Sequence, residues 1–135
     1  MSNWHAGYTA ETAYTYGYYT ELNPLRIQLL LLSWGIQPPK VSTACELGFG
    51  QGMTVNIHAA ASGTRWYGTD FNPAQTAFAQ ELAEVSGNGA VLSEQSFQDF
   101  CARSDLPDFD FIALHGIWSW ISPENQAHIS DFLAR

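Results

Sequence analysis

Three glycines at alternate positions mark the stretch of this sequence that is best suited to bind a ligand. Gly48, Gly50 and Gly52 follow a short apolar run, and a segment of helical composition begins at Met53. Glycine has no Cβ, so a ligand can lie against the backbone of such a turn, where a helix N-terminus exposes unpaired N–H groups. The pattern therefore predicts a nucleotide-type binding site.

Two carboxylates flank the glycine turn. Glu46 stands just before the first glycine, and Asp70 ends the next short apolar run, 66–69. A carboxylate at Glu46 would repel a pyrophosphate and suits a ligand with positive charge, such as a sulfonium that also has an α-ammonium group. Asp70 falls where an acidic side chain binds both ribose hydroxyls of a nucleoside. We therefore expect the two carboxylates to bracket one ligand.

The dinucleotide fingerprint is the main alternative, and it fits less well. It requires a further glycine three residues after Gly50, where this sequence has Met53. A nicotinamide-dependent oxidoreductase is therefore the less favoured interpretation.

The segments around these residues resemble a known enzyme family. Segments 46–52 (ELGFGQG) and 68–73 (GTDFNP) look like the S-adenosylmethionine site of class I methyltransferases. With 23–26 (NPLR) and 115–120 (HGIWSW), they resemble a bacterial subset in which a regulatory domain follows the methyltransferase domain. The resemblance implies S-adenosyl-L-methionine as cofactor, S-adenosyl-L-homocysteine as product, and a small molecule or a protein as methyl acceptor.

The resemblance also implies roles for individual residues. Phe71 is expected to cover one face of the adenine, the alternative being a place in the core at the strand end. Ser96 stands where the family usually has an aspartate for the adenine amino group. His115 is the candidate general base, because histidine changes protonation near neutral pH; alternatively it holds its loop by hydrogen bonds to the backbone. The expected cofactor-binding residues are Glu46, Gly48, Phe49, Gly50, Gly52, Asp70, Phe71, Ser96, Phe97, His115 and Gly116.

Charge and composition limit the classes of function. Five Lys and Arg residues against 13 Asp and Glu residues give a net charge of −8, and no basic run occurs, which disfavours binding to nucleic acid. The longest apolar run, 27–34, is too short to span a bilayer and the N-terminus lacks a leader pattern, so we expect a cytoplasmic protein without membrane contact. Cys45 and Cys101 show neither disulfide nor metal spacing, and we expect Cys45 to pack as a small apolar residue.

The elements that position the site follow from apolar runs and turn residues. Strands are expected at 41–47, 66–69, 90–92 and 108–115, and helices at 53–62, 73–86, 97–103 and from 123 onward. This alternation predicts an α/β fold, a Rossmann-like parallel sheet with flanking helices. It supplies about four of the seven strands that the class I methyltransferase resemblance implies.

Four helices carry predictions of burial. The helix that Asn23 opens and Gly35 ends is apolar almost all round, so we expect it to be largely buried. His58, in the helix after the glycine turn, is expected at a capped or solvent-edge position. The positions expected to be buried in the other two helices are Ala74, Ala77, Phe78, Leu82 and Val85, then Ile129, Phe132 and Leu133.

Two regions are expected: residues 1–22 as an aromatic N-terminal arm and 23–135 as the S-adenosylmethionine-binding domain. Tyrosines of the arm, such as Tyr14, Tyr18 and Tyr19, either close over the cofactor or fill the core and a subunit interface. Because the pattern ends after four strands, we expect either part of a longer protein or a strand edge that another chain covers. A homodimer through that edge or the arm is then expected, and a non-catalytic cofactor-binding or oligomerisation module is the alternative to an enzyme.

Overall fold

The computed structural model describes residues 4–5, 8–9 and 16–135. Near the N-terminus, β1 (Trp4–His5) and β2 (Tyr8–Thr9) pair antiparallel, and the short 3₁₀ helix η1 (Thr20–Leu22) follows. Much of the predicted arm, Tyr14 included, lies outside the described residues. Only its last part, 16–22, can therefore be related to the site.

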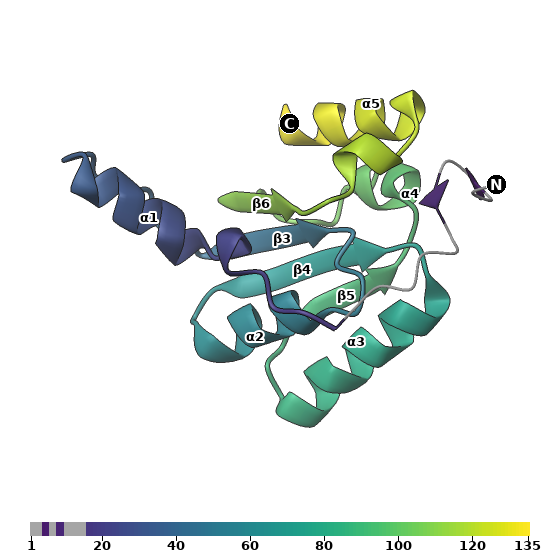
Figure 1. Cartoon of the computed structure of the whole chain (residues 1–135), viewed down its shortest axis with the longest axis horizontal. Coiled ribbons are helices and arrows are strands. Elements are labelled where there is room, and N and C mark those ends of the chain that lie inside the picture. Colours follow the sequence, from purple (N-terminus) through teal and green to yellow (C-terminus); the bar gives the residue numbers. More distant parts are fainter. Residues whose placement is uncertain (1–3, 6–7, 10–15) are drawn as a thin grey trace.

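A parallel sheet forms the centre of the chain (Figure 1). Its strands are β3 (Thr43–Leu47), β4 (Arg65–Asp70), β5 (Val91–Glu94) and β6 (Phe111–Leu114), in the order β5-β4-β3-β6. Parallel neighbours require crossover connections, and helices supply them here. The predicted α/β fold is confirmed, although some strands differ in length: the one expected over 108–115 is limited to 111–114.

Helices cover both faces of the sheet (Figure 1). On one face lie α2 (Met53–Ala61) and α3 (Pro73–Ser86), and on the other lie α4 (Phe97–Cys101) and α5 (Pro123–Leu133), which follows the 3₁₀ helix η2 (Trp118–Trp120). The two faces alternate along β3, since Ala44 packs toward α2 and α3 whereas Cys45 and Leu47 pack toward α4 and α5. Glu46 therefore belongs to the α2 side of the sheet.

The buried face of α3 is not the predicted one. The predicted positions are exposed or half-buried: Ala74, Ala77, Phe78, Leu82 and Val85. The buried positions are Gln75, Thr76, Ala79 and Ala83. Small side chains let α3 approach the start of α2, where a Cβ added to Gly52 would lie 2.4 Å from Ala79 Cβ. The prediction followed apolar size, whereas close helix packing requires small residues at the contact.

Helix α1 (Pro24–Ser33) contradicts the prediction that it is largely buried. Its ends are as predicted: the Asn23 side chain accepts a hydrogen bond from Leu25 N–H, and Gly35 has φ +72°. However, α1 extends away from the sheet (Figure 1), and Pro24 is its one buried residue. Large apolar side chains are exposed on α1 and just after it: Leu25, Ile27, Leu29, Leu30, Leu32, Trp34 and Ile36. The part of the chain that the structure describes leaves most of this apolar surface uncovered.

Other predictions had mixed outcomes. In α5, Ile129 and Phe132 are buried as expected, but Leu133 is 51% exposed because it lies on the outer side of the helix. Cys45 is a buried free thiol, which confirms its packing role. Among residues 4–5, 8–9 and 16–135, no cluster of potential metal ligands occurs, and no helix has the length and apolar character needed to cross a bilayer.

Candidate functional site

The glycine turn joins β3 to α2 at the carboxyl end of the sheet, the edge at which open α/β sheets bind ligands. Gly48, Gly50 and Gly52 have φ values of +70°, +58° and +73°, which a residue with a Cβ adopts only with strain. Gly48 N–H donates to the Thr69 carbonyl and Gly50 N–H donates to Asp70 Oδ2, both at 2.8 Å. The turn is therefore held in place by the end of the neighbouring strand β4.

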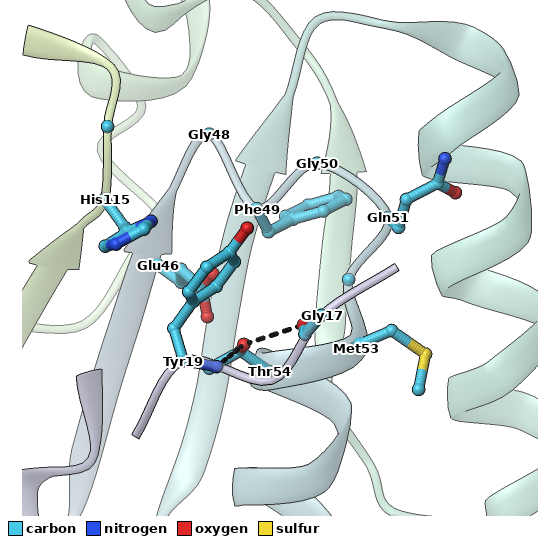
Figure 2. A pocket seen from close by; sticks show the side chains of 12 residues that line it. Gly17, Tyr19, Glu46, Gly48, Phe49, Gly50, Gln51, Met53, Thr54 and His115 are labelled. Carbon is cyan, nitrogen blue, oxygen red and sulfur yellow. Dashed lines mark hydrogen bonds between the residues drawn. The ribbon is translucent and has the colours of Figure 1, made fainter. Parts of the chain in front are cut away.

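A cavity of about 190 Å³ opens beside this turn (Figure 2). Sites that enclose a whole small ligand usually measure roughly 300–1,000 Å³, so this cavity suits one end of a nucleoside-sized molecule. The residues that line it are Gly17, Tyr19, Glu46, Gly48, Phe49, Gly50, Gln51, Gly52, Met53, Thr54, His115 and Gly116. The structure thus brings together seven of the residues expected at the site: Glu46, Gly48, Phe49, Gly50, Gly52, His115 and Gly116.

Glu46 is the buried acidic group of this cavity. Its residue is only 3% exposed, and its Oε2 atom accepts no hydrogen bond from the described residues. Burial, which is the larger cause, and the negative charge of Asp70 together raise the pKa of Glu46 to about 8. A carboxylate held this way is costly without a partner. A cationic group in the cavity would stabilise its ionised form.

Asp70 lies behind the turn rather than in the cavity lining. Register pairs Glu46 with Gly68, which places Asp70 two residues further along the same face of the sheet. Its Oδ2 accepts from Gly50 N–H and its Oδ1 from Asn72 N–H, both at 2.8 Å. Burial raises the pKa of Asp70, and these backbone N–H groups oppose the rise. Each oxygen can accept a further hydrogen bond, so bracing the turn does not prevent binding of ribose hydroxyls.

The arm segment, residues 16–22, contributes Gly17 and Tyr19 to the lining of the cavity (Figure 2). The Tyr19 ring stacks on His115 with centroids 4.0 Å apart, and Glu21 Oε1 lies 3.1 Å from His115 Nε2. Tyr19 N–H donates to Thr54 Oγ1 at 2.9 Å. Sequence reasoning missed both Glu21 and Thr54, because neither belongs to a motif and their partners lie far away in the chain.

Tyr18 of the arm segment packs on α2 instead. Its hydroxyl is 3.0 Å from Nε2 of His58, whose ring lies 5.0 Å from that of Trp66. His58 was predicted at a capped or solvent-edge position, but it is only 4% exposed. The prediction is wrong because Tyr18 and Trp66 enclose the imidazole, and this burial lowers the pKa of His58.

Besides Asp70, three expected site residues lie outside the cavity lining. Phe97 is 3% exposed in the core below the turn, where its ring would be 3.5 Å from a Cβ added to Gly48. Ser96 caps α4 by accepting a hydrogen bond from Asp99 N–H at 3.0 Å. Phe71 is half-buried directly after Asp70. Their predicted contacts with an adenine ring stay predictions.

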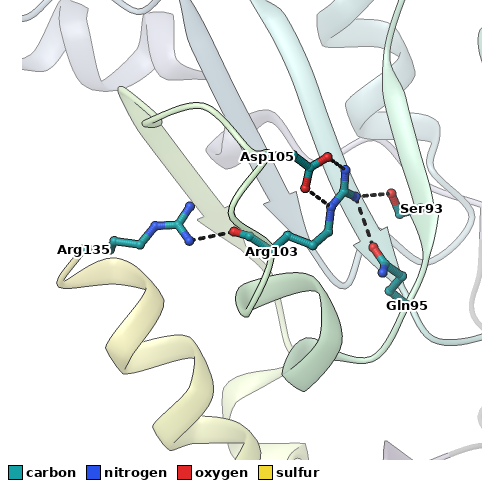
Figure 3. Close-up of polar contacts among 5 residues, drawn as sticks. All are labelled: Ser93, Gln95, Arg103, Asp105 and Arg135. Carbon is teal, nitrogen blue, oxygen red and sulfur yellow. Dashed lines mark hydrogen bonds and ion pairs between the residues drawn. The ribbon is translucent and has the colours of Figure 1, made fainter.

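The loop after β5 is braced from the α4 side (Figure 3). Arg103 donates to Ser93 Oγ at 3.2 Å and to Gln95 Oε1 at 3.1 Å, and it pairs with both oxygens of Asp105 at 2.9 and 2.7 Å. Thr69 Oγ1 donates to the Gln95 carbonyl at 2.7 Å. This loop, expected near the adenine, is thus fixed by groups of the chain itself.

Comparison with known proteins identifies one curated relative at the sequence level. No protein-family model matches the chain. The uncharacterized protein sll1526 of Synechocystis sp. is 40% identical over 135 residues, which correspond to 96% of this chain and 26% of that protein. The chain therefore spans about a quarter of the length of this relative.

Solved structures share the fold. PKMT2 from Rickettsia typhi, in complex with AdoHcy, gives a TM-score of 0.77 at 22% identity over 90% of this chain and 24% of that chain. A SAM-dependent methyltransferase from Thiobacillus denitrificans, in complex with S-adenosyl-L-homocysteine, gives 0.56 at 24% identity over 84% and 45%. One from Geobacter sulfurreducens, with the same ligand, gives 0.53 at 18% identity over 83% and 46%. The chain therefore has the Rossmann-like α/β fold of these methyltransferases.

Proposed function

We propose that this chain is the cofactor-binding portion of an S-adenosyl-L-methionine-dependent methyltransferase that acts on a small-molecule or protein acceptor. The observation that carries the proposal is Glu46, a buried carboxyl group whose Oε2 has no partner among the described residues. It lines a cavity beside a turn of three left-handed glycines, on a fold that methyltransferases share. A cationic amino-acid end of a nucleoside ligand fits this combination of charge and shape.

The residues present fit S-adenosyl-L-methionine. Glu46 would accept hydrogen bonds from the α-ammonium group, and the backbone of 48–52 would lie against the amino-acid part. Asp70 would accept from the ribose hydroxyls, and Phe71 would cover the adenine, with Ser96 and Phe97 near its edge. When bound, this cofactor supplies an electrophilic methyl group on a sulfonium. The chain must then align the acceptor and exclude water.

His115 is the proposed general base for an acceptor that carries a proton. It lines the cavity together with Gly116, at the wall opposite α2. In the described arrangement its Nε2 atom is engaged by Glu21 at 3.1 Å. His115 can therefore take a proton at Nε2 only after this contact is released, which couples base function to the position of the arm segment.

Isothermal titration of the 135-residue chain tests the proposal. The ligands are S-adenosyl-L-methionine, S-adenosyl-L-homocysteine, 5′-methylthioadenosine, which lacks the amino-acid end, and NAD. We expect the first two to bind and the Glu46→Gln variant to weaken both by roughly tenfold or more, since a charge-assisted hydrogen bond contributes about 1.5–3 kcal/mol. Binding of 5′-methylthioadenosine should change little in this variant, because that ligand has no ammonium group.

A linked proton provides a second test. Because the pKa of Glu46 lies at about 8, the group is mostly protonated at pH 7, and an ammonium partner would lower that pKa. Binding at pH 7 should then release a proton, which titrations in two buffers of different ionisation enthalpy would detect. Tight binding of NAD, or a folded chain that binds neither S-adenosyl compound, would contradict the proposal.

A second candidate is a cofactor-binding or oligomerisation module without turnover of its own. The exposed apolar surface of α1 and the position of β6 at the edge of the sheet favour it. We propose a homodimer through such surfaces, and light scattering of the purified chain would test it. The quarter-length match to sll1526 supports a place within a longer protein. We propose that this longer protein is a cytoplasmic enzyme with a regulatory domain and without a nucleic acid or membrane partner.

A further inference from the structure

The hydroxyl of Thr54 joins the arm segment to the start of α2. Thr54 is 2% exposed, and its Oγ1 accepts a hydrogen bond from Tyr19 N–H at 2.9 Å and donates to the Gly17 carbonyl at 3.4 Å. Both partners are backbone groups that lie 35 and 37 residues away in the chain. One buried side chain, next to the glycine turn, therefore binds the arm backbone at two points.

The arm segment carries two side chains to the opposite wall of the cavity. Tyr19 stacks on His115, and Glu21 pairs with the same imidazole. Tyr19, His115 and Glu46 all line the cavity (Figure 2). The arm segment is thus held on α2 at one side and after β6 at the other, with the buried carboxyl between them.

The attachments through Thr54 and through the Glu21–His115 pair differ in strength. The side chains of Glu21 and His115 are 53% and 37% exposed, and exposed ion pairs contribute little because water screens them. Thr54 is only 2% exposed, so water competes less for its hydrogen bond with Tyr19 N–H. Closure of the cavity therefore depends on Thr54 more than on the ion pair.

We propose that Thr54 is a positioning residue that holds residues 17–21 against the cavity that Glu46 lines and thereby slows the dissociation of a bound ligand. A ligand that leaves past Glu46 requires Tyr19 to move, and Tyr19 moves freely only when its N–H bond to Thr54 breaks. The identity of that ligand, an S-adenosyl compound, rests on the proposed function. The hydrogen bonds of Thr54 to the arm segment do not depend on which ligand binds.

Two variants separate the hydroxyl from the shape of the side chain. Thr54→Val keeps the shape and loses the hydroxyl, whereas Thr54→Ser keeps the hydroxyl and loses a methyl group. Hydrogen exchange of the Tyr19 amide in the ligand-free chain is the first measurement. We expect exchange to be about tenfold faster in Thr54→Val and close to wild type in Thr54→Ser, which corresponds to the loss of one buried hydrogen bond. Unchanged exchange at Cys45, in the core strand β3, controls for global unfolding.

The second measurement is the dissociation rate of S-adenosyl-L-homocysteine in stopped flow, expected to rise about tenfold in Thr54→Val and to recover in Thr54→Ser. Equal Tyr19 exchange in wild type and Thr54→Val would overturn the proposal, as would a Thr54→Ser variant that behaves like Thr54→Val. Faster exchange with an unchanged dissociation rate would overturn the control of ligand release. If exchange responds as expected but wild type binds no S-adenosyl compound, the positioning role of Thr54 is supported and the proposed function fails.

Discussion

The glycine turn and the end of helix α1 share a local signal, a glycine with positive φ. Their surroundings differ, because the turn is packed and the end of α1 is exposed. Gly52, which starts α2, and Gly35, which follows α1, have almost the same φ, +73° and +72°. A Cβ added to Gly52 would lie 2.4 Å from Ala79 Cβ, whereas one added to Gly35 would meet nothing within 4 Å. Local sequence therefore determines the backbone conformation at both places, but only tertiary packing decides what surrounds it.

The two regions also reverse the usual distribution of residue types. The site buries a carboxyl group, Glu46, without a full set of partners, whereas α1 exposes leucines such as Leu29. Buried charges and large exposed apolar patches are the two informative exceptions to ordinary surface statistics. On the proposed function a cationic ligand would pair with Glu46, and in the proposed homodimer another protein surface would cover α1.

The largest expected effect compares the two glycines directly. Gly52→Ala should reduce the free energy of unfolding by about 4 kcal/mol, because the new Cβ both overpacks against Ala79 and requires a strained φ. Gly35→Ala has the same strain without the clash and should cost about 1 kcal/mol. Urea denaturation of both variants measures the difference. Equal losses would show that α3 does not pack against the turn as described.

The next effect compares two leucines. Leu47 is fully buried at the end of β3, and its truncation to Ala should cost about 3 kcal/mol through lost burial and a residual cavity. Leu29 is 68% exposed on α1, so Leu29→Ala should change stability by less than about 0.5 kcal/mol. Denaturation at two protein concentrations would measure both. A cost above about 1 kcal/mol for Leu29→Ala would mean that another chain covers α1 in solution.

The third effect is a pH dependence of the free energy of unfolding that arises from one group of the site. The pKa of Glu46 is about 8 in the folded chain and close to 4.5 when the group is exposed by unfolding. Between these values the folded state binds the extra proton, so the free energy of unfolding falls as the pH rises. From pH 6 to pH 8 the ligand-free chain should lose about 2 kcal/mol, since one pKa unit corresponds to about 1.4 kcal/mol.

Glu46→Gln is the matched control for that prediction. An amide of the same shape has no ionised form, so the variant should lack this slope and exceed wild type in stability at pH 8. Denaturation curves at pH 6, 7 and 8 for both proteins measure how the free energy of unfolding changes with pH. A wild-type slope that persists in Glu46→Gln would assign the titration to another group, and the case for a buried, unpartnered carboxyl would fail.

Much of the fold was predictable because the signals were local. The glycine turn, the starts of the helices at Pro73 and Pro123 and the four strands all appear where short-range patterns placed them. The errors concern burial. For α1, apolar composition indicated a core helix, but composition does not tell which surface covers it. For α3, the large Val85 was expected inside, whereas the small Ala79 makes the contact with α2.

In the candidate site, too, only the residues with local sequence signals were predictable. Glu46 and the glycines could be placed at one cavity because strand ends and their following turns meet at one edge of a parallel sheet. Glu21 and Thr54 could not, because their contacts join segments far apart in the chain and follow no spacing rule. Hydroxyl and carboxylate groups outside motifs carry no signal until the fold brings their partners near.

The smallest expected effect compares the caps of the two helices that begin with Asn-Pro. Asn72 Oδ1 accepts from both Ala74 and Gln75 N–H in α3, whereas Asn23 Oδ1 accepts from Leu25 N–H alone in α1. Asn72→Ala should therefore cost about 1 kcal/mol, near the centre of the range for cap removal, and Asn23→Ala about 0.5 kcal/mol. The difference has a second cause: loss of the α3 cap loosens a helix that packs on the glycine turn, whereas α1 can fray into solvent without disturbing the core. Urea denaturation resolves the two values, and amide exchange in the first turn of each helix shows whether the loss stays local. If Asn23→Ala proves the more costly, α1 is part of the cooperative unit, and the contrast between a packed site and a free helix does not hold in solution.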